Sequence, residues 1–172
     1  MSTPDADLLG AWRNIDISGL RTPHLLTSTQ QLHWYTEGVC NPRSGMRYWK
    51  IIGADGDGLD CIVGFGGLCG IQWENRIAEI SLIIEPQSRG LGKGGEAVKL
   101  ILSAGFNQLN LKTIYGECYY NNDDAVEFWG KITMKYNGTV AELPNRKYWG
   151  GKYYNSLYFS IDADEYRKHT TR

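Results

Sequence analysis

One short stretch of this 172-residue chain combines glycines with two basic side chains. It lies between an apolar segment that ends at Pro86 and an apolar helical pattern, and it consists of Arg89, Gly90, Leu91, Gly92, Lys93, Gly94 and Gly95. Glycines let consecutive backbone N–H groups point at one concave spot, which side chains would otherwise block. The positive end of the helix dipole and the two basic charges add to this attraction for anions. The segment therefore predicts a binding site for a pyrophosphate group.

Three kinds of phosphate-binding loop compete for this segment. A Walker loop requires Gly-Lys-Ser/Thr, whereas Gly95 is followed by Glu96. A Gly-x-Gly-x-x-Gly pattern starts at Gly90, but the acidic residue near the expected distance, Glu117, lies inside a strand and not at its tip. A protein-kinase loop requires a valine two positions after its last glycine, where this chain has Ala97. A dinucleotide-dependent oxidoreductase remains an alternative.

A fourth interpretation, which fits best, rests on the spacing Arg89-x-x-Gly92-x-Gly94. This spacing resembles the Arg/Gln-x-x-Gly-x-Gly/Ala signature of the GNAT N-acetyltransferases. Residues 79–86 are similar to the fourth strand of that family, and residues 122–129 (NDDAVEFW) are similar to the Asn-x-x-Ala segment that opens its next helix. Three further segments resemble the RimJ/RimL-like branch of the family: 12–14, 31–35 and 152–157. The resemblance covers most of residues 12–166.

The resemblance implies acetyl-CoA as co-substrate and no metal ion. In this family the central strands splay apart and acyl-CoA lies in the gap, so backbone groups of Ile83 and Ile84 would hold the pantetheine and polarise the thioester carbonyl. The amides of residues 89–95 would bind the pyrophosphate, and Asn122 would contact the pantetheine or the thiol end. The acetyl group would pass directly to a primary amine, so Cys118 is expected to be a core residue and not a nucleophile.

Glu79 is the candidate general base. A primary amine is mostly protonated at neutral pH because its pKa is near ~10, and a carboxylate in a half-buried cleft can accept that proton. The competing interpretation is a structural glutamate that pairs with Arg76 or with a surface lysine. Many relatives carry a tyrosine as general acid where this chain has Trp129, and an indole cannot supply a proton. The candidate replacements are Tyr119, Tyr120 and Tyr154.

The region around the last predicted strands is rich in aromatic and basic side chains. This aromatic-basic region consists of Tyr148, Trp149, Tyr153, Tyr154 and Tyr158, with Arg146, Lys147 and Lys152 nearby. Tyr148, Trp149 and Tyr154 are the candidate wall of an acceptor site, because aromatic faces bind cations, sugars and bases. Packing of the hairpin itself is the competing interpretation. The acceptor is therefore left open among a small amine, a protein N-terminus, an amino sugar nucleotide, and an aminated nucleobase or DNA. A non-catalytic acyl-CoA-binding domain is the alternative from another class.

The elements that must position these residues follow from the apolar periodicity. Strands are predicted at 47–52, 61–71, 77–84, 113–120, 136–143 and 153–161, with a glycine-rich turn at 53–58. Helices are predicted at 30–36, 96–106 and 123–131, whereas residues 1–11 are expected to be loose. Together with the resemblance, this order predicts an α/β (α+β) fold. Its single mixed, mostly antiparallel sheet would have about seven strands, flanked by helices and splayed at its centre.

Composition and charge indicate one compact domain spanning residues 1–172. Apolar residues make up 42 %, charged residues 22 %, and the net charge is −1, which argues against an electrostatic nucleic-acid binder and a polybasic membrane anchor. The four cysteines lack metal-ligand spacing and are expected to be reduced. The most apolar stretch, 62–71, is too short to span a bilayer. We therefore expect a cytoplasmic protein, and a homodimer is compatible with the sequence.

Overall fold

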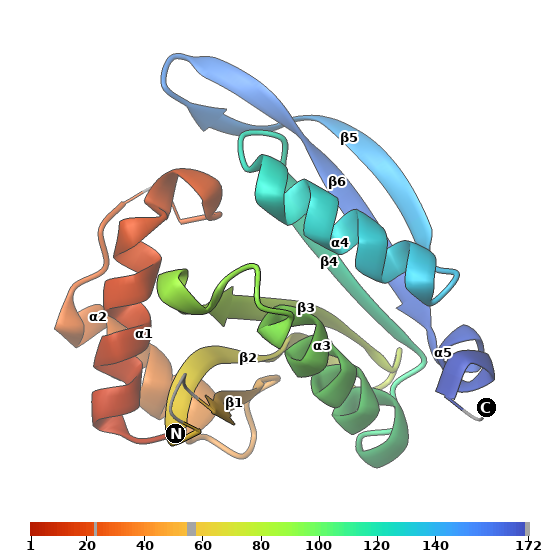
Figure 1. Ribbon diagram of the computed structural model, residues 1–172, viewed down its shortest axis with the longest axis horizontal. Coiled ribbons are helices and arrows are strands. Elements are labelled where there is room, and N and C mark those ends of the chain that lie inside the picture. Colours follow the sequence, from red (N-terminus) through yellow and green to blue (C-terminus); the bar gives the residue numbers. More distant parts are fainter. Residues whose placement is uncertain (23, 55–57, 171–172) are drawn as a thin grey trace.

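The computed structural model describes residues 1–22, 24–54 and 58–170. Its centre is one mixed sheet with the strand order β1-β2-β3-β4-β6-β5 (Figure 1). The strands are β1 (Arg47–Ala54), β2 (Asp60–Gln72), β3 (Ile77–Ile84), β4 (Thr113–Tyr119), β5 (Thr139–Trp149) and β6 (Lys152–Asp162). The α/β fold and the mostly antiparallel sheet are confirmed, although the described residues form six strands and not about seven. The turn predicted at 53–58 falls partly on residues 55–57, outside the described residues.

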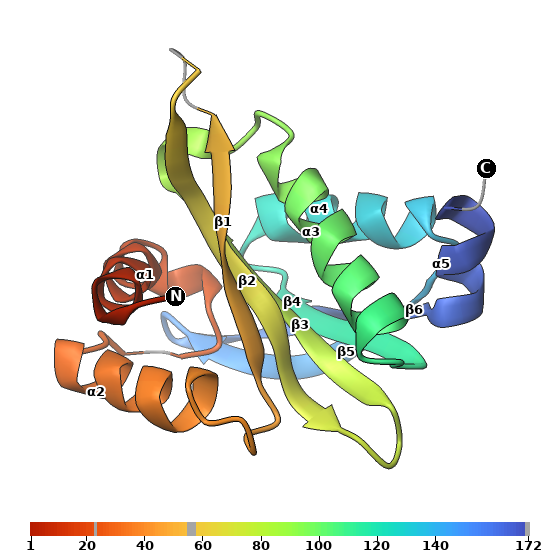
Figure 2. The same ribbon diagram turned by 90° about the horizontal axis from the view of Figure 1, so that it is seen from below.

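Helices lie on both sides of the sheet (Figure 2). One side carries α1 (Thr3–Ile15) and α2 (Ser28–His33), and the other carries α3 (Lys93–Ser103) and α4 (Asp123–Lys135). Short turns η1 (Ile17–Gly19), η2 (Trp34–Val39), η3 (Pro86–Ser88) and η4 (Ala104–Gln108) connect these elements, and α5 (Ala163–Thr170) follows β6. Within the described ranges, no helix is long and apolar enough to cross a membrane.

The two central strands separate after a short paired stretch. Parallel pairing of β3 with β4 joins Ile77–Glu79 to Thr113–Tyr115. From there β3 continues to Ile84 beside β2, whereas β4 continues to Tyr119 beside β6. The predicted splay is therefore present, and it opens the sheet next to Glu79.

The expectation that residues 1–11 are loose is wrong. They form most of α1, whose first turn is closed by a capping box. Ala6 and Leu9 are fully buried, and the ring of Trp12 packs on Phe65 of β2 with the centroids 5.4 Å apart. The apolar stripe of α1 is short and interrupted by polar residues, so its helical period is weak in the sequence. Burial against the sheet stabilises the helix.

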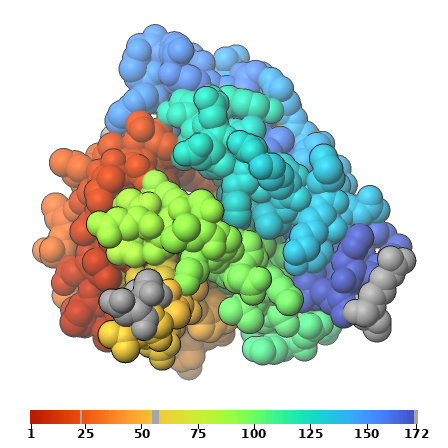
Figure 3. All heavy atoms as spheres, in the orientation of Figure 1, coloured from red at the N-terminus to blue at the C-terminus, as the bar shows by residue number. Residues whose placement is uncertain are grey.

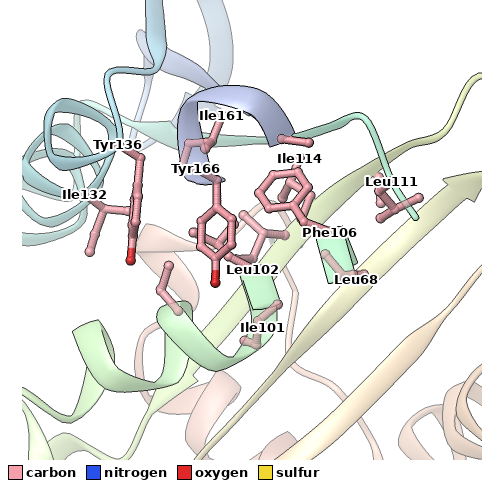
Figure 4. Packing of buried hydrophobic residues seen from close by; sticks show 14 of the residues in the cluster. Leu68, Ile101, Leu102, Phe106, Leu111, Ile114, Ile132, Tyr136, Ile161 and Tyr166 are labelled. Carbon is pink, nitrogen blue, oxygen red and sulfur yellow. The ribbon is translucent and has the colours of Figure 1, made fainter. Parts of the chain in front are cut away.

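The larger core lies between the sheet and helices α3, α4 and α5 (Figure 4). It includes Leu68, Ile80, Val98, Ile101, Leu102, Phe106, Ile114, Ile132, Tyr136, Phe159, Ile161 and Tyr166. Tyr166 of α5 packs against Phe106 and Tyr136, with ring centroids 5.0 Å and 5.5 Å away. This aromatic contact attaches α5, an element that the apolar periodicity did not predict.

Candidate active site

The glycine-rich loop joins β3 to α3. Gly90 and Gly92 adopt left-handed φ angles of +73° and +78°, and a Cβ built on Gly90, Gly92 or Gly95 would meet open space. The helix α3 begins directly after Gly92, and the first amides of a helix have no acceptor within the helix. A bare, concave backbone surface at a helix N-terminus fits an anionic pyrophosphate.

The two basic side chains of this loop are held by the protein itself. Arg89 pairs with Asp16 after α1, and its Nε donates to the carbonyl oxygen of Ile84 at 3.1 Å. The Nζ of Lys93 donates to the carbonyl oxygen of Ala54 at 2.7 Å. In this arrangement both basic side chains have protein partners, so anion binding by the backbone amides and contact of the two charged groups with a pyrophosphate both stay predictions.

The remaining cofactor candidates surround the gap between the splayed strands. Ile83 and Ile84 lie in the part of β3 that has separated from β4, and Leu91 is exposed. Asn122 caps α4, since its Oδ1 accepts from the backbone N–H of Ala125 at 3.1 Å. Its contact with a pantetheine therefore also stays a prediction. Figure 3 shows a hollow where the N-terminal segment, the loop after β3 and the start of α4 meet.

An open cleft of about 520 Å³ lies on the face of the splayed strands that α1 covers. It is lined by Arg21, Glu79, Tyr115, Glu117, Tyr119, Leu143, Arg146 and Tyr158. Successive side chains of a strand point to opposite faces, so Tyr115, Glu117 and Tyr119 of β4 share one face with Glu79 of β3. The rings of Tyr115 and Tyr158 stack with centroids 5.6 Å apart, which gives the cleft an aromatic side.

Glu79 forms a two-point ion pair with Arg21. The Nη2 and Nη1 atoms of Arg21 lie 2.6 Å and 3.1 Å from the two carboxylate oxygens of Glu79. Arg21 also donates from Nε to the hydroxyl of Tyr119 at 3.2 Å. The hydrogen bond to Glu79 raises the pKa of Arg21 above its usual range despite partial burial. Arg76, the partner considered from the sequence, instead donates to Asn110.

Glu117 is the more buried carboxylate of the cleft, with 9 % of its side chain exposed against 24 % for Glu79. Its Oε1 accepts from Arg146 Nε at 2.9 Å and from Ser156 Oγ at 2.6 Å. Burial by itself would raise the pKa of Glu117, but these hydrogen bonds and the charges of Arg146 and Arg21 lower it. Glu117 therefore stays ionised and anchors its neighbours.

Sequence reasoning found part of this cleft: Glu79 and Tyr119 were candidates for base and acid, and Arg146 and Tyr158 belonged to the aromatic-basic region. The alternation along β4 was a signal that could have placed Tyr115 and Glu117 beside Glu79. Arg21 comes from the segment between η1 and α2, and Arg146 comes from β5, so neither position has a periodic signal that points to the site.

The predicted aromatic wall lies elsewhere. Tyr148, Trp149 and Tyr154 flank the β5–β6 turn and are not among the residues that line the described cleft. Tyr148 is exposed, and its ring packs on Tyr153 with centroids 5.1 Å apart. The aromatic side chains at the cleft come from β4 and β6 instead.

The residues considered as general acid or nucleophile lie in different parts of the structure. Tyr119 lines the cleft, whereas Tyr120 does not. Trp129 stacks on Phe159 with ring centroids 4.6 Å apart and is a packing residue. Cys118 is buried in β4, and burial raises the pKa of its thiol to about 11, as suits a core residue. Among the residues that the structure describes, no group of His, Cys, Asp or Glu side chains could hold a metal ion.

Residues 2–135 match the family of acetyltransferase (GNAT) domains. The chain belongs to the GNAT acetyltransferases. This GNAT chain is 30 % identical over 96 residues to spermidine N(1)-acetyltransferase of Escherichia coli K12. The aligned residues cover 56 % of this chain and 50 % of the relative. It is 29 % identical over 80 residues to the uncharacterized N-acetyltransferase YnaD of Bacillus subtilis, and the aligned residues cover 46 % of this chain and 47 % of that relative. The chain thus spans about half the length of the curated relatives it matches.

Solved GNAT structures share the fold over nearly the whole chain. Spermidine N-acetyltransferase from Vibrio cholerae in complex with CoA and spermine superposes with a TM-score of 0.79 at 19 % identity, over 96 % of this chain and 94 % of that one. A dodecameric structure of the Vibrio cholerae enzyme superposes with a TM-score of 0.77 at 19 % identity, over 99 % of this chain and 95 % of that one.

In this GNAT domain, the glycine loop and the cleft flank one gap between β3 and β4. The loop offers backbone amides to an anion, and the cleft offers the carboxylate of Glu79 to a cation. The arrangement can therefore bind an anionic and a cationic ligand whose reacting ends meet in the gap.

Proposed function

We propose that this chain transfers the acetyl group of acetyl-CoA to a primary amine, with polyamines as the acceptor class. The observation that carries the proposal is the carboxylate of Glu79 in an open cleft, at the point where β3 and β4 separate. The GNAT family supports the reaction type, and the spermidine N(1)-acetyltransferase at 30 % identity supports the acceptor. We therefore favour a polyamine-acetylating branch over the RimJ/RimL-like branch that residues 12–14, 31–35 and 152–157 resemble.

The chain's backbone groups would bind the co-substrate. Acetyl-CoA supplies an activated thioester. The amides of residues 89–95 would bind its pyrophosphate, and the backbone of Ile83 and Ile84, in the part of β3 that has separated from β4, would hold the pantetheine. Asn122, which caps the start of α4, would contact the pantetheine or the thiol end.

Glu79 would accept the proton that the acceptor must lose. An ammonium group cannot attack a thioester, because its nitrogen has no free electron pair, and the pKa of a primary amine is near ~10. The carboxylate of Glu79 takes the proton directly or through one water molecule. The aromatic faces of Tyr115 and Tyr158 favour a cation in the same cleft. Water or the hydroxyl of Tyr119 protonates the departing thiolate, which is a tolerable leaving group because a thiol pKa lies near ~8.5.

A cytoplasmic location, one functional domain and self-association belong to the same proposal. The four cysteines are free thiols, which suits a reducing compartment. The edge strand β5 exposes Val140 and Tyr148, a surface suited to pairing with a second copy. Light scattering of the purified chain tests the oligomeric state.

The test of the reaction is thiol release with spermidine at saturating acetyl-CoA. We expect Glu79→Gln to lower kcat/KM by about 10²–10⁴-fold, the usual contribution of a general base, with CoA affinity by calorimetry unchanged. Glu127→Gln, which removes an exposed carboxylate of α4 paired with Lys131, is the matched control and should keep wild-type turnover. Wild-type turnover in Glu79→Gln would show that Glu79 is not the base. CoA binding without turnover of polyamines, amino sugars or peptides would favour a non-catalytic acyl-CoA-binding domain.

A further inference from the structure

Arg21 holds the carboxylate that the proposed function assigns to the acceptor. Its Nη2 lies 2.6 Å from Oε1 of Glu79 and 3.5 Å from Oε2 of Glu117. Two carboxylates thus converge on a single nitrogen of the chain's own guanidinium group. A positively charged nitrogen at this position has the electrostatic surroundings that an acceptor ammonium requires.

The charges of the cleft are balanced while Arg21 is in place. Arg146 and Ser156 already hold Glu117, and its side chain is 9 % exposed. Glu79 is the carboxylate that a ligand can reach, but both of its oxygens accept from Arg21. A cationic ligand therefore meets a cleft with no net negative charge until the guanidinium moves.

The backbone around Arg21 is held by Lys147, whereas the guanidinium is held by groups of the cleft, namely Glu79, Glu117 and Tyr119. Lys147, which is 6 % exposed, donates from Nζ to the carbonyl oxygens of Ser18 and Leu20, the second at 2.5 Å. By contrast, 58 % of the Arg21 side chain is exposed. The guanidinium can swing into solvent by rotation of its side chain, with the segment that carries it left in place.

We propose that Arg21 is a specificity-determining residue, an internal cation that the acceptor must displace from Glu79. The position of Arg21 Nη2 marks the site of the acceptor ammonium. This inference rests on the proposed function in one respect, namely that Glu79 receives the amine. Competition of this kind reduces the apparent association constant of every acceptor. The apparent constant equals the intrinsic one multiplied by the fraction of molecules in which Glu79 is free.

The test is calorimetric binding of spermidine to the CoA-saturated protein, in which no acetyl group can be transferred. We expect Arg21→Met to bind spermidine about three- to fivefold more tightly than wild type, which is the strength of a half-exposed ion pair expressed as an affinity ratio. Arg21→Lys keeps a competing cation and should stay closer to wild type. Lys131→Met removes a positive charge that pairs with a glutamate on α4, outside the cleft, and should leave the spermidine affinity unchanged. Equal or weaker binding by Arg21→Met would overturn the inference, because a positioning residue loses affinity when it is removed.

The displacement inference and the proposed acetyl transfer can be refuted independently of each other. Tighter spermidine binding by Arg21→Met, together with no thiol release by the wild-type chain, refutes acetyl transfer and supports displacement, whereas thiol release by wild type with unchanged binding by Arg21→Met refutes displacement alone. Arg21→Gln is a second neutral variant and is measured beside Arg21→Met. Thermal melts show which of the two variants is folded, and the spermidine affinity of a folded variant decides between displacement and positioning.

Discussion

At the scale of single residues, two glutamates of one cleft have different surroundings. Glu117 is nearly buried and accepts hydrogen bonds from Arg146 and Ser156, whereas Glu79 is more exposed and is held by the half-exposed side chain of Arg21. A carboxylate that is fixed by several donors is suited to hold its neighbours in place. A carboxylate whose partner can leave is suited to meet a ligand. The environment, and not the residue type, separates the two roles.

The surroundings of Glu117 predict a dependence of stability on pH. Its pKa is lower in the folded protein than its ordinary value of 4.5, so the ionised form contributes stability above that value, and this contribution is lost as the pH falls through the folded pKa. We expect the free energy of unfolding of wild type to fall between about pH 5 and pH 3, and Glu117→Gln to fall less steeply. Urea titrations across this range measure both slopes. Parallel slopes would contradict the prediction, and Glu74→Gln, at an exposed position in the turn after β2, should follow wild type.

At the scale of elements, α3 begins three residues before the predicted start at Glu96. Its first residue is Lys93, because Gly92 takes a φ of +78° and occupies the N-cap position. The apolar pattern could not reveal this start, since residues 93–96 contain no large apolar side chain. The early start matters for function, because it directs the first amides of the helix at the glycine loop.

This geometry predicts a specific cost for a side chain at Gly92. Gly92→Ala places a Cβ on a left-handed residue, which costs about 1–2 kcal/mol and shifts the helix start. We expect lower stability in urea and weaker CoA binding by calorimetry. Gly130→Ala in α4 is the control, because its added Cβ meets open space, and it should raise stability by about 0.5–1 kcal/mol with CoA affinity unchanged. Wild-type CoA affinity in Gly92→Ala would show that these amides are not the anion site.

At the scale of the whole molecule, the N-terminal segment completes both halves of the site. After α1, Asp16 reaches Arg89 of the glycine loop, and Arg21 reaches Glu79 in the cleft. Both contacts depend on α1 being attached to the sheet, which Leu9 and Trp12 achieve by packing in a second, smaller core. Residues that resembled a loose tail in the sequence therefore help to form the functional face.

A single core substitution tests this attachment. Leu9→Ala removes a fully buried side chain and should lower the free energy of unfolding by about 2–5 kcal/mol. Leu100→Ala, at an exposed position of α3, should change it by less than about 0.5 kcal/mol. Urea denaturation of both variants gives the comparison. An unchanged free energy for Leu9→Ala would mean that α1 contributes little to the fold.

By itself, the sequence determined the features that depend on neighbours along the chain. The strand at 77–84 has the predicted bounds, and the helix predicted from residue 123 begins at Asp123. The glycine loop between strand and helix was predictable for the same reason, because periodicity, capping and glycine content are local properties. Glu79 was identified as a candidate through its place on that strand.

Only the tertiary structure decided what surrounds Glu79. Its partner Arg21 is 58 positions away in the sequence, and Arg21 lies 96 positions from Glu117. β5 continues through Pro144, beyond the predicted strand end at residue 143, because an edge strand tolerates a residue that lacks an N–H donor. Such contacts follow from how the layers pack, and packing between distant segments has no period that a local pattern could reveal. The charge of the cleft therefore became visible only when the N-terminal segment and β5 were placed against β3 and β4.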